Sequence, residues 1–205
     1  MLTHSRIMLL ALSCLTVIGC GQEGTPPRGV RAVGLKTERM NYYASAQQAS
    51  NWCWSACIQM ILSAHDVSVT QQDIVAAAFG RLLDHPGDLQ DIQAVLNATW
   101  IDRYGNAKRV HATPKQGPPH VDELRTLLRN ETPVIVCYTP PEAPVGHAVI
   151  VTAVISEATS QGEHLVRLVV RDPWPAYQAE KGKRTMSPDE YQSIWAYYVV
   201  EVGVP

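Results

Sequence analysis

The segment from Gln47 to Leu62 constrains the fold of this 205-residue chain more than any other. Its first residues are polar, and from Ser55 onward it is rich in helix formers and core residues. This pattern predicts a loop that turns into a buried helix, with Cys53 in the first helical turn. The unpaired N–H groups and the positive dipole end of a helix favour thiolate over thiol, and the thiolate is the nucleophile. The segment therefore predicts a reactive cysteine.

Two glutamines precede this cysteine. Gln47 lies six residues upstream of Cys53 and could donate a side-chain N–H to an oxyanion that forms beside the sulfur. Gln48 is its immediate neighbour and could take the same role if the loop differs by one residue. We therefore predict Gln47 as the oxyanion donor, with Gln48 as the alternative.

A general base and its partner are predicted at the ends of two strands. His147 follows a glycine and opens a run of β-branched apolar residues, which indicates a buried strand. Asp172 ends a second apolar run, just before Pro173, and can bind the second imidazole nitrogen and stabilise the imidazolium. Taken singly, each of these residues could be an ordinary core or turn residue. Together they predict Cys53, His147 and Asp172 as the catalytic residues.

These motifs resemble those of the papain-like cysteine peptidases. In that family a glutamine lies six residues before a Cys–Trp pair that opens the central helix, as Gln47 and Cys53–Trp54 do here. The family histidine commonly begins a His–Ala–Val strand, as His147 does. Asp172–Pro173–Trp174 stands where the family usually has asparagine followed by tryptophan. An aspartate there is similar to bacterial branches, including relatives of the double-glycine leader peptidases, and the resemblance spans residues 46–202.

The resemblance implies a papain-like fold and hydrolysis of peptide bonds in a protein or peptide substrate, through a thioester acyl-enzyme and without a cofactor. The distance along the chain from Cys53 to His147 is 94 residues, whereas papain itself has about 130–150. The Cys-Gly-Ser-Cys signature is also absent, so its disulfide is not expected. These departures favour a compact bacterial variant and leave the substrate class open.

Three alternatives remain at this stage. The same Cys–His–Asp chemistry performs acyl transfer, and it also cleaves the amide bonds of cell-wall peptides. A membrane-tethered binding module that kept the fold without activity is the third alternative. The intact set of Cys53, His147 and Asp172 favours an enzyme, because binding alone requires none of them.

The N-terminal residues 1–19 are predicted to be a bacterial lipoprotein signal peptide. The apolar stretch that begins at Ile7 is too short to span a bilayer. It ends in Val17–Ile18–Gly19–Cys20, which resembles a lipoprotein processing site with Cys20 as the lipidated residue. We expect a lipid-anchored protein of the cell envelope, and Gly21 in place of aspartate indicates the outer membrane where the host has one. The alternative is an ordinary signal peptide in which Cys20 is apolar filler.

Residues 20–37 lack periodicity and are predicted to be a tether, which leaves residues 38–205 as one peptidase domain. The formal net charge of −2, without a basic cluster, gives no support for a nucleic-acid partner. The histidines show no paired ligand spacing, so no metal is predicted. The sequence carries no signal for an oligomeric state.

The three cysteines of this domain are an odd number, which favours a working thiol over a disulfide framework. Cys57 lies one helical turn after Cys53, and Cys137 lies inside an apolar strand. Both are interpreted as small buried residues.

The remaining pattern places helices before strands, which predicts an α+β fold with the cysteine helix packed against a C-terminal antiparallel sheet. Capping boxes are predicted at Thr70 and Ser187. Residues 98–119 are predicted to be a loop that borders the cleft or simply connects two elements. The predicted helices cover residues 74–79, 88–96 and 121–128, and the predicted strands cover residues 133–138, 147–155, 164–171 and 196–202.

Overall fold

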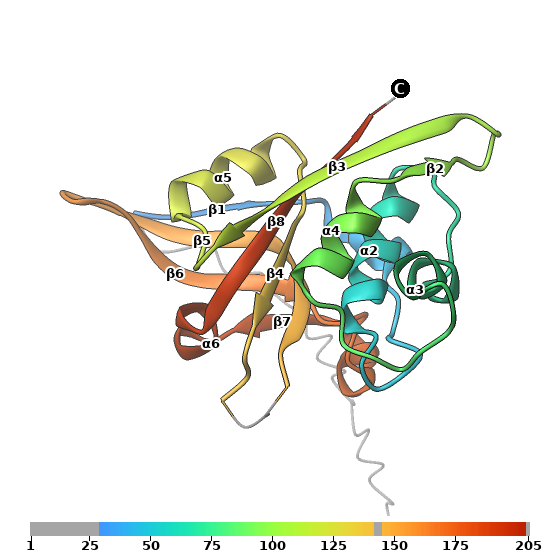
Figure 1. Ribbon diagram of the computed structural model, residues 1–205. Coiled ribbons are helices and arrows are strands. Elements are labelled where there is room, and N and C mark those ends of the chain that lie inside the picture. Colours follow the sequence, from blue (N-terminus) through green and yellow to red (C-terminus); the bar gives the residue numbers. More distant parts are fainter. Residues whose placement is uncertain (1–28, 142–144, 204–205) are drawn as a thin grey trace, which may run out of the picture.

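The computed structural model describes residues 29–141 and 145–203 (Figure 1). Within them the chain forms helices and one eight-stranded sheet. The helices are α1 (Thr37–Tyr43), α2 (Cys53–Ala64), α3 (Gln71–Phe79), α4 (Leu89–Leu96), α5 (Val121–Arg129), the short 3₁₀ helix η1 (Pro175–Glu180) and α6 (Pro188–Gln192). The strands are β1 (Val30–Gly34), β2 (Thr99–Ile101), β3 (Ala107–Gln116), β4 (Val134–Tyr138), β5 (His147–Thr159), β6 (Gly162–Arg171), β7 (Lys183–Met186) and β8 (Ile194–Gly203).

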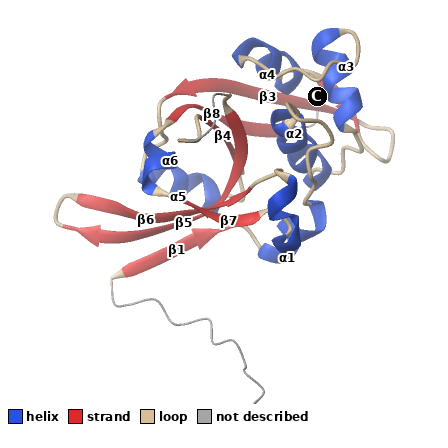
Figure 2. Ribbon diagram, turned by 90° about the horizontal axis from the view of Figure 1, so that it is seen from below, coloured by secondary structure: helices blue, strands red, loops and turns tan. Residues whose placement is uncertain are grey.

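The sheet runs in the order β2-β3-β8-β4-β5-β6-β7, and β1 pairs with β5 beside this path. Every strand pair is antiparallel. Helices α2, α3 and α4 gather at one end of the molecule, while β1, β5 and β6 extend away from them (Figure 2). The predicted α+β class, with the cysteine helix packed against an antiparallel sheet, is confirmed.

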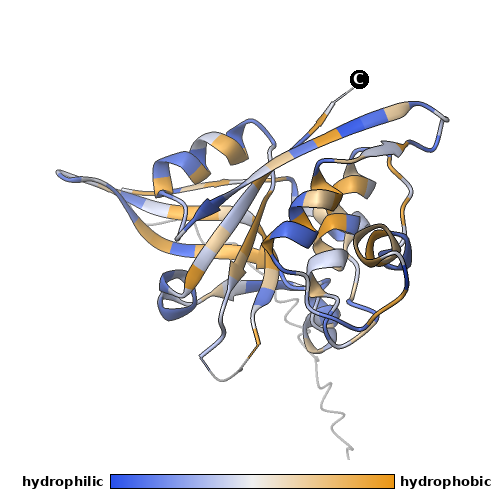
Figure 3. Ribbon diagram, viewed as in Figure 1, coloured by the Kyte–Doolittle hydropathy of each residue, from blue (hydrophilic) through white to orange (hydrophobic). Residues whose placement is uncertain are grey.

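Helix α2 is buried along most of its length because it packs against the sheet on one side and against α3 and α4 on the other. Nine of its residues are buried, from Cys53 to Leu62. Helix α5 is different, since it carries both hydrophilic and hydrophobic residues (Figure 3). Its leucines Leu124 and Leu128 are buried in a second core cluster with β5 and β6.

Strand β4 explains how the sheet separates these two cores. Successive side chains of a strand point to opposite faces. Ile135 and Cys137 belong to the cluster around α2, whereas Val134, Val136 and Tyr138 belong to the cluster around α5. Because both faces are covered, every residue of β4 is buried.

The prediction of a tether over residues 20–37 is wrong in its second half. Residues 20–28 lie outside the described part, but Val30–Gly34 form β1 and pair with β5 in the register Val30↔Glu157. The physical reason is the length of β5, whose second half extends past β4 and leaves an edge open to pairing. Val33 also packs against the core cluster of α5. Residues 30–34 therefore belong to the folded domain and not to a tether.

The prediction of a loop over residues 98–119 is also wrong. β2 and β3 form a hairpin there, and β3 pairs with β8 over eight residue pairs. Only Val110 and Ala112 of β3 are fully buried, so the alternating pattern is too short to stand out from the sequence. The predicted capping boxes at Thr70 and Ser187 are confirmed.

In the described part of the chain, no helix combines the length and the apolar character that a membrane span requires. The predicted signal peptide and the lipidation site at Cys20 lie outside the described residues.

Candidate active site

Cys53 is the first residue of α2, where the sequence predicts it. The flanking tryptophans fix this end of the helix: the indole N–H of Trp52 donates to the carbonyl of Leu83 at 2.7 Å, and that of Trp54 donates to the carbonyl of His85 at 3.3 Å. Both rings are buried and pack around the helix start. Cys53 itself is 7% exposed and lines a surface cavity. The thiol is therefore shielded from most of the solvent but open to a substrate.

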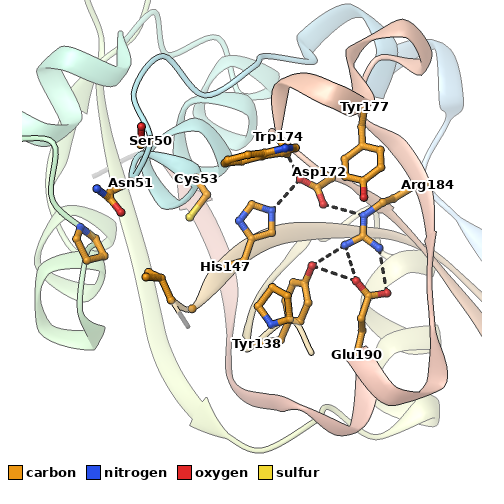
Figure 4. Close-up of a pocket in the computed structure, with 14 residues that line it drawn as sticks. Ser50, Asn51, Cys53, Tyr138, His147, Asp172, Trp174, Tyr177, Arg184 and Glu190 are labelled. Carbon is orange, nitrogen blue, oxygen red and sulfur yellow. Dashed lines mark hydrogen bonds and ion pairs between the residues drawn. The ribbon is translucent and has the colours of Figure 1, made fainter. Parts of the chain in front are cut away.

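His147 is the first residue of β5 and pairs with Tyr138 of β4. The next residue, Ala148, packs against α2 and accepts a hydrogen bond from the thiol of Cys57 at 3.4 Å. This contact places the start of β5 beside the start of α2, although the two elements are far apart in the sequence. The imidazole consequently lies next to the Cys53 sulfur (Figure 4).

Asp172 follows β6 directly and completes the predicted group. Its Oδ1 lies 2.8 Å from Nε2 of His147 and also accepts the backbone N–H of Trp174 at 2.9 Å. The other ring nitrogen, Nδ1, is left on the side of the Cys53 sulfur (Figure 4). The structure thus places the three predicted residues in the order thiol, imidazole, carboxylate.

The electrostatics of this arrangement favour a charged imidazole. Burial opposes the charge, but hydrogen bonds to Asp172 and Cys53 outweigh it and raise the pKa of His147 to about 9. Burial alone would raise the pKa of Asp172. The hydrogen bonds from His147, Trp174 and Arg184 outweigh it, so this pKa is lowered. Asp172 therefore stays ionised as the partner of the imidazole.

A glycine holds the backbone of Asp172. The N–H of Asp172 donates to the carbonyl of Gly182 at 2.8 Å. Gly182 has a φ of 73°, a left-handed conformation that L side chains rarely adopt. A Cβ at this position would lie 2.5 Å from the carbonyl oxygen of Asp172. Only glycine fits here without moving the carboxylate.

The two predicted oxyanion donors lie close to the site but outside its cavity lining. Gln47 is buried, and its backbone N–H donates to the carbonyl of Pro173 at 2.9 Å. Its side-chain Nε2 donates to the carbonyls of Ala49 and Ser50 at 3.0 and 2.9 Å, and its Oε1 has no partner. The Gln47 amide therefore supports the turn that leads into α2 in this conformation.

Gln48 points elsewhere. Its side-chain Oε1 accepts a hydrogen bond from Gln72 at 2.6 Å on the exposed surface. Its backbone N–H donates to the buried amide of Gln71 at 2.9 Å. Gln48 is thus tied to α3.

The cavity over the site has a volume of about 400 Å³. Besides the three predicted residues, it is lined by side chains that the sequence analysis did not select, chiefly Asn51, Tyr138, Tyr177, Arg184 and Glu190. A neighbouring cavity of about 320 Å³ shares Cys53 and His147 and has an apolar wall with Trp54, Ile92 and Trp195. Both cavities are lined mostly by apolar surface, and Cys53 and His147 lie where they meet.

The other two cysteines are buried, as predicted. Burial raises the pKa of Cys137 to about 12 and that of Cys57 well above its ordinary value. Neither thiol ionises readily, and of the three only Cys53 lines the cavity of about 400 Å³. Among the described residues, no group of three or more His, Cys, Asp or Glu side chains gathers as metal ligands would.

A family model described as papain-like cysteine protease AvrRpt2 matches residues 36–193. Curated proteins gave no significant match. Among solved structures, the peptidase domain of Streptococcus ComA, a bi-functional ABC transporter involved in a quorum sensing pathway, aligns with a TM-score of 0.51 and 14% identity. The alignment covers 78% of this chain and 97% of that domain, and it shows a shared fold.

Proposed function

Because the chain belongs to the papain-like cysteine protease family, we propose that it cleaves peptide bonds through a thioester acyl-enzyme on Cys53. His147 serves as general base and acid, and Asp172 orients the imidazole. One observation carries this proposal: the 2.8 Å contact between His147 Nε2 and Asp172 leaves Nδ1 toward the thiol at the start of a buried helix. A nucleophile, its base and an orienting carboxylate in sequence are what nucleophilic catalysis requires.

Acylation begins with proton transfer from the Cys53 thiol to Nδ1 of His147. The thiolate attacks the carbonyl carbon of the peptide bond, and the electron pair of the carbonyl moves onto its oxygen. When this tetrahedral intermediate collapses, the C–N bond breaks and His147 gives its proton to the leaving amine. A thioester between the substrate acyl group and Cys53 remains.

Deacylation uses the same residues in reverse. His147 takes a proton from a water molecule, whose oxygen attacks the thioester carbonyl. The C–S bond then breaks, the acid product leaves, and the proton returns to the Cys53 sulfur. Throughout both steps Asp172 accepts the Nε2–H bond and stabilises the imidazolium when it forms.

The backbone N–H of Cys53 is one donor to the oxyanion, because the first N–H groups of a helix have no intrahelical acceptor. Gln47 is the proposed second donor. Its Nε2 must then exchange one of its bonds to the carbonyls of Ala49 and Ser50 for the oxyanion. The partnerless Oε1 leaves the amide with few contacts that resist such a rotation.

The experiment that tests this proposal exposes the chain from Gly21 onward to a proteome-derived peptide mixture and identifies new termini by mass spectrometry. We expect cleavage by the wild type and no cleavage by the Cys53→Ala and His147→Ala variants. Cys137→Ala is the matched control, because it removes a buried thiol outside the mechanism. New termini that persist in Cys53→Ala, or none in the wild type, contradict the proposal.

The same experiment, repeated with an added primary amine and with peptidoglycan fragments, separates the alternatives. Acyl transfer predicts products that carry an added primary amine when the mixture contains one, whereas hydrolysis predicts free carboxyl termini. A cell-wall amidase leaves ordinary peptides intact and cleaves peptidoglycan fragments. An inactive binding module captures peptides without any covalent change at Cys53.

We further propose that the protein is exported and anchored through a lipid on Cys20, in the outer membrane where the host has one. The support is the sequence Val17–Ile18–Gly19–Cys20, after an apolar stretch too short to span a bilayer. Bacterial cells fed an alkyne-labelled fatty acid should label the full chain in the membrane fraction. The Cys20→Ser variant should lose the label, and equal labelling of both proteins contradicts the anchor.

A further inference from the structure

Beside Asp172 lies a group of three side chains that the proposed mechanism does not use, and one of them, Tyr138, also packs its ring edge-on against His147 at 5.8 Å between centres. They are Arg184 from β7, Glu190 from α6 and Tyr138 from the end of β4, and we call them the Arg184 cluster (Figure 4). All three line the cavity over the site.

The guanidinium of Arg184 divides its donors between Asp172 and the rest of the cluster. Its Nε donates to Oδ2 of Asp172 at 2.7 Å. Its two terminal nitrogens meet the two carboxylate oxygens of Glu190 at 3.0 and 2.9 Å. One of them also donates to the hydroxyl of Tyr138 at 2.5 Å. The planar fork of arginine suits this bidentate geometry, which the single ammonium of lysine cannot reproduce.

The place of Arg184 is fixed by strand pairing. β7 runs beside β6, with Arg184 opposite Val170, two residues before Asp172. The guanidinium also lies over the ring of Tyr177, 5.2 Å from its centre. The side chains of Arg184 and Glu190 are only 13% and 16% exposed, and that of Asp172 is 2% exposed. Charges in such a setting interact more strongly than charges in water.

His147 alone does not keep the buried Asp172 carboxylate ionised throughout the catalytic cycle. In the proposed cycle the imidazole is charged in some steps and neutral in others. Its positive charge therefore stabilises the Asp172 carboxylate only in some of the steps. A buried carboxylate without a countercharge tends to take up a proton. Arg184 is charged throughout and reaches the carboxylate oxygen that His147 does not use.

We propose that Arg184 is a positioning residue of this peptidase, which keeps Asp172 ionised and aimed at His147 through the whole catalytic cycle. Glu190 and Tyr138 hold Arg184 in place through the hydrogen bonds that they share with its guanidinium. This inference rests on the proposed function, because a positioning role has meaning only if His147 and Cys53 carry out the reaction.

The charged groups near Asp172 give the direction of the pH effect. His147 and Arg184 face it directly. Glu190, Tyr138 and Tyr177 contact Arg184, Tyr138 also packs against the His147 ring, and the Cys53 thiol lies on the other side of the imidazole. The hydrogen bond from Arg184 is among the causes that lower the pKa of Asp172. Without this bond Asp172 takes up a proton at higher pH. The acid limb of the pH–activity profile therefore moves to higher pH.

The test measures kcat, KM and the pH profile for a peptide that the wild type cleaves. We expect Arg184→Gln to lower kcat about 10- to 100-fold, by analogy with the partners that orient metal-binding side chains, with little change in KM. Its acid limb should move to higher pH. Arg184→Lys keeps the charge but not the planar fork of donors. It should therefore have a kcat between those of Arg184→Gln and the wild type, and an acid limb at nearly the wild-type pH. Lys183→Gln, on the same strand but exposed, is the matched control and should behave as the wild type.

A double-variant cycle separates positioning from a purely structural role. In the Asp172→Asn background, Arg184→Gln should lower kcat less than about threefold further, because Arg184 acts through Asp172. A full loss in that background, or an unshifted acid limb in both Arg184 variants, overturns the inference. If Arg184→Gln does not fold, Arg184→Lys and Glu190→Gln give the same comparison. Failure of the proposed function looks different, since the wild type would then not depend on Cys53.

Discussion

The substitution Asp172→Asn tests the electrostatic basis of the site. In the structure the pKa of His147 is raised from the ordinary 6.5 to about 9, although burial acts in the opposite direction. Since one pKa unit corresponds to about 1.4 kcal/mol, this difference means a preference of about 3 kcal/mol for the charged imidazole. The hydrogen bond to Asp172 stands first among the causes that raise it. An amide in place of the carboxylate removes that bond and its charge, while the burial remains.

We therefore expect the pKa of His147 to fall from about 9 in the wild type toward its ordinary value in Asp172→Asn, because burial and the Cys53 contact remain and oppose each other. The measurement is an NMR titration of the imidazole Cε1–Hε1 signal with labelled histidine, in which the His147→Ala spectrum identifies the signal. Asp122→Asn is the control, because it removes an exposed carboxylate far from the site in the sequence. A titration that stays above pH 8 in Asp172→Asn would refute the reasoning, since Cys53 alone would then hold the charge.

The same pKa shift predicts how the free energy of unfolding depends on pH. His147 has a folded pKa above its unfolded value, so its contribution is fully present below pH 6.5 and is lost as the pH rises through about 9. Urea unfolding of the wild type should show a fall in the free energy of unfolding across this window. In Asp172→Asn that particular fall should disappear.

The remaining predictions concern the oxyanion loop and the turn behind Asp172. Gln47→Ala should lower kcat about 10²- to 10³-fold, whereas Gln48→Ala should change it little because its amide bonds Gln72 at the surface; peptide cleavage kinetics check both, and equal effects contradict the choice of Gln47. Gly182→Ala should lower the free energy of unfolding by about 1–3 kcal/mol and reduce kcat, because its Cβ meets the carbonyl of Asp172. Urea unfolding measures the first effect, and wild-type stability contradicts it.

The sequence predicts most of what lies along one stretch of chain. Cys53, His147 and Asp172 each mark a local change, from loop to helix, into a strand, or out of one, and such changes are visible without partners. The capping boxes are visible for the same reason, since all their contacts lie within four residues. The order of the three motifs then predicts a shared site, and the geometry places them together.

What the sequence does not reveal depends on partners far away in the chain. β1 has no periodic pattern of its own and becomes a strand because the second half of β5 offers it an edge. β3 likewise depends on β8, more than eighty residues later, and buries only two side chains fully. Gln47 lies at the predicted spacing, but the conformation of its amide follows from the carbonyls of the turn around it.

Arg184 shows why the same limit applies to function. It follows Lys181–Gly182–Lys183, and such a basic run in a sequence indicates a solvated loop. Glu190 is visible only as the partner of the Ser187 capping box, a role that it does fill. Once β7 pairs with β6, the side chain of Arg184 turns inward and meets Asp172, while its exposed neighbour Lys183 does not. No local sequence pattern identifies a residue that reaches the site through the pairing of two strands. Such a residue can be recognised only from the three-dimensional arrangement.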